Sequence, residues 1–107
     1  MVLVTTGADT HQDHQVLHSE AVRAFKDTTL WGYELPWNSL RFSAQAFVTL
    51  NQEHIDRKWA SLQAYKSQFE LQRPYFNKDV IYGLARVRGV QVRTEYAEVF
   101  EVVRFRC

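Results

Sequence analysis

The chain has 107 residues, 46% of them hydrophobic and 14% aromatic, which is enough apolar material for one small globular domain. Its net charge of +1 gives no reason to expect a nucleic-acid partner, and no apolar run reaches the roughly 20 residues needed to span a bilayer. The single cysteine, Cys107, excludes a disulfide framework or a cysteine metal cluster built by this chain. Together with the absence of a signal-peptide pattern, this predicts a cytoplasmic protein.

The first predicted element is a strand at about Val2–Thr6. Its residues V-L-V are consecutive and apolar, the pattern of a parallel strand that is buried on both faces. A strand of that kind needs neighbours on both sides, and the sequence has nothing before it. We therefore expect the chain to be the carboxy-terminal part of a larger domain, with one edge of this strand unpaired and open to another chain.

A helix is predicted next, continuing to about Lys26. Thr10 is the expected N-cap, and Asp13, three residues later, completes a capping box. A stripe at helical spacing runs through this segment and consists of His14, Leu17, His18, Ala21 and Phe25. The stripe places His14 on the helix face that packs against the sheet. His11 lies one turn earlier, at the mouth of the crevice outside the carboxyl end of the strand.

The middle of the chain is predicted to form two more strands. A turn at Asp27–Thr28 leads into a strand at Thr29–Glu34. A loop from Pro36 to about Ser43 ends that strand and leads to a short extended segment at Ala46–Leu50.

Two helices are predicted in the second half of the chain. Thr49 or Asn51 caps the first of them, which runs to about Gln68. Its apolar stripe consists of Ile55, Trp59, Leu62 and Phe69, with Tyr65 beside it. The second helix spans about Asn77–Arg88, and Gly89 is expected at its C′ position. The apolar residues of the second helix are Val80, Ile81, Leu84 and Val87.

The last predicted element is a strand at about Glu95–Phe105, with apolar residues on both of its faces. Glu98 lies among them and needs a partner if it is drawn inside. It is either a structural acid paired with an arginine, such as Arg86, Arg88 or Arg93, or a residue that reaches the pocket. The chain contains no repeat or linker, so its strands and helices predict a single α/β domain.

The segment T-H-Q-D-H, residues 10–14, carries the candidate chemistry. Ligands of open α/β sheets bind at the carboxyl ends of the strands, and H-x-x-H places His11 and His14 on one helical face. Because neutral imidazole is a common zinc ligand, the pair can share a metal, or one histidine can bind the metal while the other moves a proton. A catalytic zinc takes about three protein ligands, and His18 would complete a set of histidines only. The alternative is a hydrogen-bonded histidine at a helix–sheet contact.

The other candidate residues also have structural interpretations. Asp13 either caps the helix or hydrogen-bonds His11 and fixes its tautomer. His18 is more typical of a histidine at the edge of the core, and His54, on the exposed side of a helix start, has no predicted partner. The arginines of residues 86–93 lack a glycine-rich loop or interleaved aromatic residues, which favours a solvated face over phosphate binding.

Several short motifs follow one another in a specific order. The run V-L-V-T-T-G-A-D-T-H-Q-D-H-Q at residues 2–15 precedes Y-E-L-P at 33–36, F-V-T-L at 47–50 and Y-K-S-Q at 65–68. R-G at 88–89 then precedes Y-A-E-V-F at 96–100. In this order, and over essentially the whole chain, the sequence resembles the LmbE-like (PIG-L) metal-dependent de-N-acetylases. The ordered set is much more specific than H-x-D-H alone.

The resemblance implies an incomplete Rossmann-like three-layer sandwich, with the carboxy-terminal part of the sheet and about three helices. It also implies a hydrolase that removes the N-acetyl group from N-acetylglucosaminyl compounds, glycolipids included, with Zn²⁺ or another divalent metal as cofactor. By the family pattern, His14 is a metal ligand. His11 stabilises the developing oxyanion, protonates the leaving amine, or does both, and Asp13 orients and tunes His11. The resemblance does not identify the substrate-binding residues.

The sequence departs from the family in one respect. The A-H-P-D-D-E motif, which supplies the family's other two metal ligands and its general base, is absent from residues 1–107. His18 and Asp9 are the residues available as substitute ligands. One hypothesis is a de-N-acetylase domain truncated at its amino-terminal side, with little activity alone and no tightly held metal. The other is an inactive truncated or split-subunit protein that acts only with a partner chain.

Overall fold

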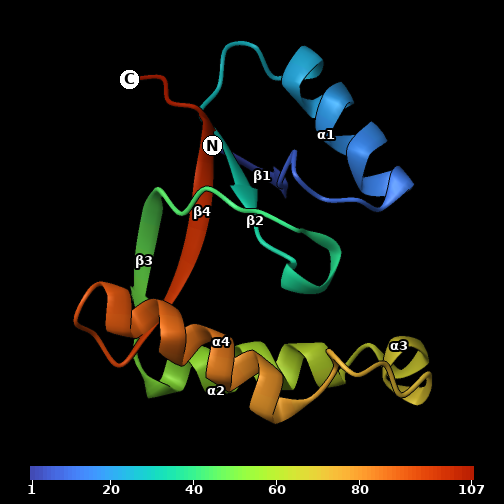
Figure 1. Cartoon of the computed structure of the whole chain (residues 1–107), viewed down its shortest axis with the longest axis vertical. Helices are drawn as coiled ribbons and strands as arrows, with labels where there is room; N and C mark the ends of the chain where they lie inside the picture. Colours follow the sequence, from blue (N-terminus) through green and yellow to red (C-terminus); the bar gives the residue numbers. More distant parts are fainter. The chain divides into compact units, whose positions relative to one another are not determined.

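The chain forms an α/β fold with a four-stranded mixed sheet and four α-helices, three of which follow one another between the last two strands. The computed structural model describes all residues from 1 to 107. In chain order the elements are β1 (Val2–Thr5), α1 (Gln12–Ala24), β2 (Leu30–Tyr33), the 3₁₀ helix η1 (Pro36–Asn38), β3 (Ala46–Leu50), α2 (Gln52–Gln63), α3 (Lys66–Glu70), α4 (Lys78–Gln91) and β4 (Tyr96–Arg104) (Figure 1). No helix combines the length and the apolar character that crossing a membrane requires.

The strand order of the sheet is β1-β2-β4-β3. β1 and β2 are parallel, with Val2 opposite Leu30 and Thr5 opposite Tyr33. β2 and β4 are antiparallel, and their register shifts between Leu30 and Trp31. β1 therefore has one neighbour in this chain, and its other edge is unpaired, as the sequence predicts.

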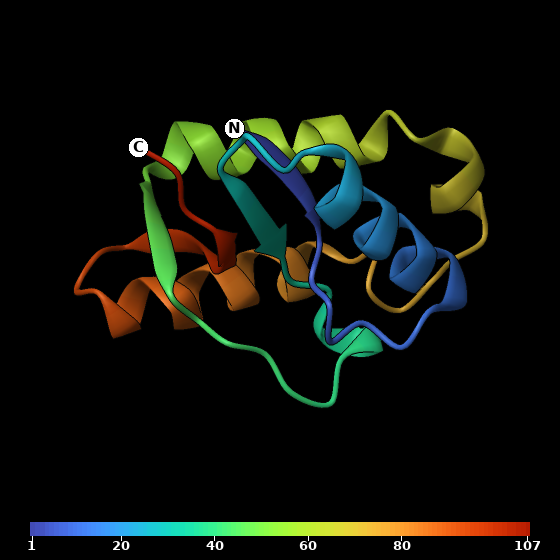
Figure 2. The ribbon, with the colours of Figure 1, turned by 90° about the horizontal axis from the view of Figure 1, so that it is seen from above.

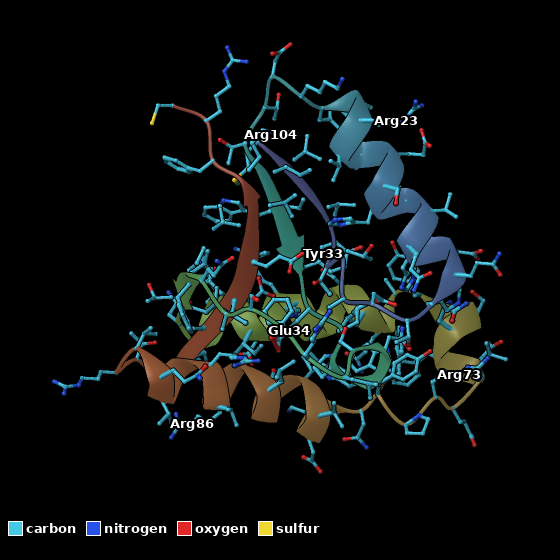
Figure 3. All side chains as sticks on the ribbon, turned by 45° about the horizontal axis from the view of Figure 1, so that its top comes forward. Arg23, Tyr33, Glu34, Arg73, Arg86 and Arg104 are labelled. Carbon is cyan, nitrogen blue, oxygen red and sulfur yellow. The ribbon has the colours of Figure 1, made fainter.

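The contacts divide the chain into two units, residues 1–46 with 99–107, and residues 47–98. In the first unit, which we call the loop unit, α1 lies along β1 (Figure 1). The core of this unit consists of Val4, Ala21 and Leu30, with Val2, Val22 and Val103 packed around them. Arg104 closes the end of α1, because its guanidinium donates to the carbonyl oxygen of Phe25 over 2.8 Å (Figure 3).

The predicted stripe of α1 is partly wrong. Leu17 and Phe25 are 52% and 43% exposed, whereas Ala21 is buried. The ring of His18 bonds to the carbonyl oxygen of Thr5 in β1, and the ring of His14 bonds to Asp9 in the loop after β1. The helix thus turns the ring of His18 toward β1 and the ring of His14 toward the loop, and the apolar Leu17 is exposed. The reason is that both histidines have a buried polar partner in or next to β1.

In the second unit, which we call the helical unit, α2 and α4 run alongside one another, and α3 lies in the connection between them (Figure 2). Its core consists of Ile55, Ile81 and Ala85, with Trp59, Leu62, Tyr82 and Tyr96 packed around them.

The prediction for α2 is confirmed at the start of the helix and wrong at its end. Asn51 is the N-cap and forms a capping box with His54, so His54 has a partner and Gln52 is the first helical residue. The helix ends at Gln63, five residues earlier than predicted, and the following turn starts the separate helix α3. Phe69 of α3 still packs against Trp59, with ring centroids 5.8 Å apart and the ring planes tilted by 57°. The structure therefore has four helices where about three were predicted.

Gly89 is not the C′ residue of α4, because the helix continues to Gln91. A Cβ atom added to Gly89 would lie 2.7 Å from the carbonyl oxygens of Thr94 and Glu95. The glycine is needed for this close approach of the chain to the helix. The left-handed backbone position falls instead on Arg93, with φ of 61°.

Glu98 pairs with Lys58 of α2, at 2.5 Å between Oε1 and Nζ, and not with an arginine as predicted. Arg86, one of the predicted partners, pairs instead with Glu95 over 3.7 Å. Glu98 is therefore a structural acid of the helical unit. Its carboxylate remains one-third exposed, which lowers the desolvation cost of the charge.

Candidate functional site

The candidate site lies in the loop that connects the carboxyl end of β1 to α1. All of the fully buried polar side chains of the chain are found there: Thr5, Thr6 and Asp9. The N–H and the hydroxyl of Thr10 both donate to the carbonyl oxygen of Asn38, over 2.7 and 2.8 Å, and hold the loop against η1. Because β1 and β2 are parallel, their carboxyl ends meet at the same edge of the sheet, which is the expected position for a ligand site.

Asp9 is the central residue of this loop. Its side chain is fully buried, and its two carboxylate oxygens have different partners. Oδ2 lies 2.9 Å from Nδ1 of His14, and Oδ1 accepts the backbone N–H of His11 over 2.8 Å. An ionised carboxylate can only accept, so Nδ1 of His14 carries the hydrogen. In neutral His14 the lone pair is therefore on Nε2.

His11 has the opposite tautomer. It is the N-cap of α1, and its Nδ1 accepts the backbone N–H of Asp13 over 3.2 Å. Nδ1 must be unprotonated to accept, so neutral His11 carries its hydrogen on Nε2. The rings of His11 and His14 are stacked, with centroids 4.5 Å apart and an interplanar angle of 24°. The pair thus presents one nitrogen acceptor and one N–H donor side by side.

The predicted capping arrangement of α1 is wrong in its residues. His11 takes the N-cap position, because the hydroxyl of Thr10 is occupied by Asn38. Asp13 contributes its backbone N–H to His11, and its exposed carboxylate has no hydrogen bond to either histidine. That carboxylate lies in the first turn, where a negative charge stabilises the helix dipole.

His18 holds the helix to the strand. Its Nδ1 lies 2.8 Å from the carbonyl oxygen of Thr5, so this nitrogen carries the hydrogen and donates. Its Nε2 faces Gly7, where an added Cβ atom would lie only 2.9 Å away. His18 is therefore placed as a structural histidine, and it does not join the pair formed by His11 and His14.

Glu101 also holds the loop, although sequence reasoning did not single it out. Its side chain crosses β2 at Gly32, where an added Cβ atom would lie 2.8 Å from Cγ of Glu101. Its Oε1 then accepts the backbone N–H of Gly7 over 2.9 Å. A bulkier residue at position 32 would obstruct this path.

Tyr33 at the end of β2 is close enough to respond to the charge of Asp9 (Figure 3). Burial raises the pKa of the Tyr33 phenol, and the negative charge of Asp9 raises it further. The phenol is therefore neutral at physiological pH and can act as a hydrogen-bond donor at the rim of the loop.

The side chains of this loop can supply part of a metal site but not all of its ligands. No group of three or more His, Cys, Asp or Glu side chains is arranged to hold a metal ion. His14 offers Nε2, but both oxygens of Asp9 are already engaged and His18 is bound to Thr5. A catalytic zinc needs about three protein ligands, so at least two would have to come from outside this loop.

Neither a protein-family model nor a curated protein nor a solved structure matches this chain. The functional interpretation therefore rests on the order of the sequence motifs and on the geometry of the loop between β1 and α1.

Proposed function

We propose that this chain supplies some of the residues of a metal-dependent de-N-acetylase site, in a Rossmann-like domain of the LmbE-like (PIG-L) type. The substrate class is N-acetylglucosaminyl compounds, and the cofactor is Zn²⁺ or another divalent ion. The observation that supports the proposal is the stacked pair of His11 and His14 in opposite tautomers at the carboxyl end of a parallel strand. Amide hydrolysis needs both a metal ligand and a donor to the developing oxyanion, and the pair offers both.

Each histidine has one role in this proposal. His14 contributes Nε2 as a metal ligand, since its Nδ1 is held by Asp9. When bound, the metal would polarise the amide carbonyl and activate water. His11 donates its Nε2–H to the oxyanion. Protonation of the leaving amine by His11 would require a hydrogen on both ring nitrogens, and Nδ1–H would then face the N–H of Asp13. The geometry thus favours the oxyanion role.

The remaining ligands and the general base would come from a segment that carries the A-H-P-D-D-E motif. Residues 1–107 do not contain that motif. We therefore expect the chain alone to have little or no activity and not to hold zinc tightly.

A reconstitution experiment tests this proposal. The purified chain is mixed with a polypeptide that bears the A-H-P-D-D-E motif, and acetate release from an N-acetylglucosaminyl substrate is measured with and without zinc. We expect zinc-dependent activity in the mixture only, and its loss with His14→Ala. A clear rate from the chain alone, abolished by His14→Ala, would contradict the expected dependence on a second segment. No activity in any mixture would contradict the function itself.

A substitution at His11 tests its proposed role as an oxyanion donor. His11→Asn keeps an N-cap side chain that can accept the N–H of Asp13, but it removes the imidazole Nε2–H. We expect activity to fall by about 10²- to 10³-fold, as for other oxyanion donors, with the helix intact. His54→Gln is the matched control, because Gln preserves the capping box of α2. It should leave the activity unchanged.

A second candidate function is association with a partner chain through β1, without catalysis. The N–H groups of Val2 and Thr6 donate to carbonyl oxygens of Thr29 and Tyr33, so the N–H group of Leu3 points to the opposite, open edge. The edge is open at this end of the strand only, because Thr5 is buried and its carbonyl oxygen is bonded to His18. Leu3 is also half exposed. Such an edge can accept a strand from another chain.

Leu3→Pro tests this second function, because proline removes one outward N–H at a position where an edge strand tolerates it. Association is measured by light scattering, with the circular dichroism spectrum as the control for folding. We expect the Leu3→Pro variant to remain folded and to lose its association with the partner chain. A complex of unchanged affinity would exclude pairing through this edge.

A further inference from the structure

The carboxylate of Asp9 is buried at an energetic cost that its partners must offset. A carboxylate with a fully buried side chain loses its hydration and needs strong partners in return. The loop is held independently of that carboxylate. The N–H of Asp9 donates to the carbonyl oxygen of Thr6, the amide of Gln15 donates to the carbonyl oxygen of Asp9, and Thr10 is bound to Asn38.

The partners of the carboxylate are instead the two histidines. Oδ2 bonds the ring of His14 and Oδ1 bonds the backbone of His11. Residues nearby do not compete for these oxygens: His18 is bound to Thr5, and the Asp13 carboxylate is exposed. Tyr33, whose pKa the charge of Asp9 helps to raise, is the other ionisable group that responds to this carboxylate.

We propose that Asp9 is the positioning residue of the histidine pair. One of its oxygens holds His14 in the tautomer whose Nε2 lone pair points away from the loop, and the other fixes the backbone of His11 at the start of α1. The consequence for catalysis rests on the proposed function, whereas the effect on the tautomer does not. Neither the sequence motifs nor the resemblance gives Asp9 this role: they assign the orientation of His11 to Asp13 and name no partner for the ring of His14.

The substitution Asp9→Asn separates the two bonds, because an asparagine side chain has one acceptor oxygen and one donor NH₂ group. If its oxygen accepts from His11, its NH₂ faces His14 and can donate only to an unprotonated Nδ1. His14 then moves its hydrogen to Nε2 and loses the outward lone pair. If its oxygen accepts from His14 instead, its NH₂ opposes the N–H of His11 and the helix start loses a bond.

Ring nitrogen NMR of the ¹⁵N-labelled chain tests the proposal at about pH 8.5, where an ordinary histidine is neutral. In the wild-type chain we expect His14 with its hydrogen on Nδ1 and His11 with its hydrogen on Nε2. In one orientation of its amide, Asp9→Asn should move the His14 hydrogen to Nε2. In the other, the hydrogen stays on Nδ1, the first turn of α1 is weakened, and the amide hydrogen of His11 exchanges faster. Asp13→Asn is the matched control and should change neither tautomer, because Asp13 contacts His11 through its backbone.

The wild-type spectrum alone can overturn the proposal, so the test does not depend on the folding of a variant. His14 with its hydrogen on Nε2 would exclude positioning by Asp9. So would an Asp9→Asn chain that keeps both the His14 tautomer and the protection of the His11 amide.

The reconstituted mixture adds a second readout. There, Asp9→Asn should weaken zinc binding by about 10- to 100-fold, as loss of a partner behind a ligand does. Correct tautomers in a mixture that never binds zinc would leave the positioning role intact and refute the proposed function.

Discussion

The two units of the chain differ in what they bury. The loop unit buries Thr5, Thr6 and Asp9 together with its apolar core, whereas the core of the helical unit is apolar. The helical unit also has a polar network, in which Asp56 accepts from Tyr82 and Gln52, but this network lies at the surface.

The difference indicates where the fold accepts an energetic cost. Polar groups at the surface keep part of their hydration, and their bonds contribute little. A buried carboxylate needs well-placed partners or it destabilises the fold. Asp9 has such partners, and they are the two histidines of the candidate site. Buried polarity at a strand end therefore marks the candidate site more clearly than the spacing of the histidines does.

The first prediction concerns the apolar cores, in which the two units should be alike. Leu30 and Ile55 are both fully buried, one in each unit. Leu30→Ala and Ile55→Ala should each lower the free energy of unfolding by about 2–5 kcal/mol, measured by urea denaturation. A loss below about 1 kcal/mol for either variant would mean that its cluster is not a true core.

The second prediction concerns buried polarity, in which the units should differ. The hydroxyl of Thr6 accepts the N–H of Ala8 over 3.2 Å, and Thr6 is fully buried. Thr6→Val keeps the volume but leaves that N–H without its partner, so we expect a loss of about 1–3 kcal/mol in urea. Ile81→Val in the helical unit serves as the comparison, with an expected loss of about 0.5–1.5 kcal/mol. A Thr6→Val chain as stable as wild type would remove the energetic distinction between the units.

The third prediction uses two glycines of α4. Gly83 is exposed in the helix interior, and an added Cβ atom would meet nothing within 4 Å. Gly83→Ala should raise the free energy of unfolding by about 0.5–1 kcal/mol, because alanine loses less backbone entropy on folding. Gly89→Ala is the control and should destabilise, since its Cβ atom would meet two carbonyl oxygens. Thermal unfolding measures both, and equal effects would contradict the close approach at Gly89.

The smallest expected effect belongs to the surface network of the helical unit. The hydroxyl of Tyr82 donates to Asp56, which lowers the pKa of Asp56 and raises the pKa of Tyr82 to about 12. Tyr82→Phe removes the donor to the carboxylate, so the pKa of Asp56 should rise toward 3.8, as followed by carboxyl-carbon NMR. An unchanged titration would show that the bond does not persist in solution.

Much of the fold could be predicted from hydrophobic pattern alone. The segment Ala46–Leu50 forms a strand with the predicted bounds, and the predicted α/β class is confirmed. The errors occur where tertiary contacts override local signals. α2 ends at Gln63 without a glycine or proline to mark its end, and Gly89 lies inside a helix because the chain passes close to it.

The site was less predictable, because its partners are set by the path of the loop. Spacing brought His11 and His14 together, and the structure stacks their rings. The supporting carboxylate was expected from Asp13 and comes from Asp9, which the sequence suggested only as a substitute metal ligand. Its one local signal is an acidic residue two positions before the N-cap of α1. The metal, the substrate class and the catalytic roles stay predictions.

The bond from Gly7 to Glu101 has a consequence for the order in which the protein forms. It joins residues that are 94 positions apart, so the loop after the first strand is fastened by a side chain from the last one. Contacts between such distant residues form late, because a long stretch of chain must be ordered first. During synthesis the loop would remain without this tether until Glu101 had left the ribosome. The histidine pair would therefore reach its final geometry only after β4, which follows it by more than 80 residues, has joined the sheet.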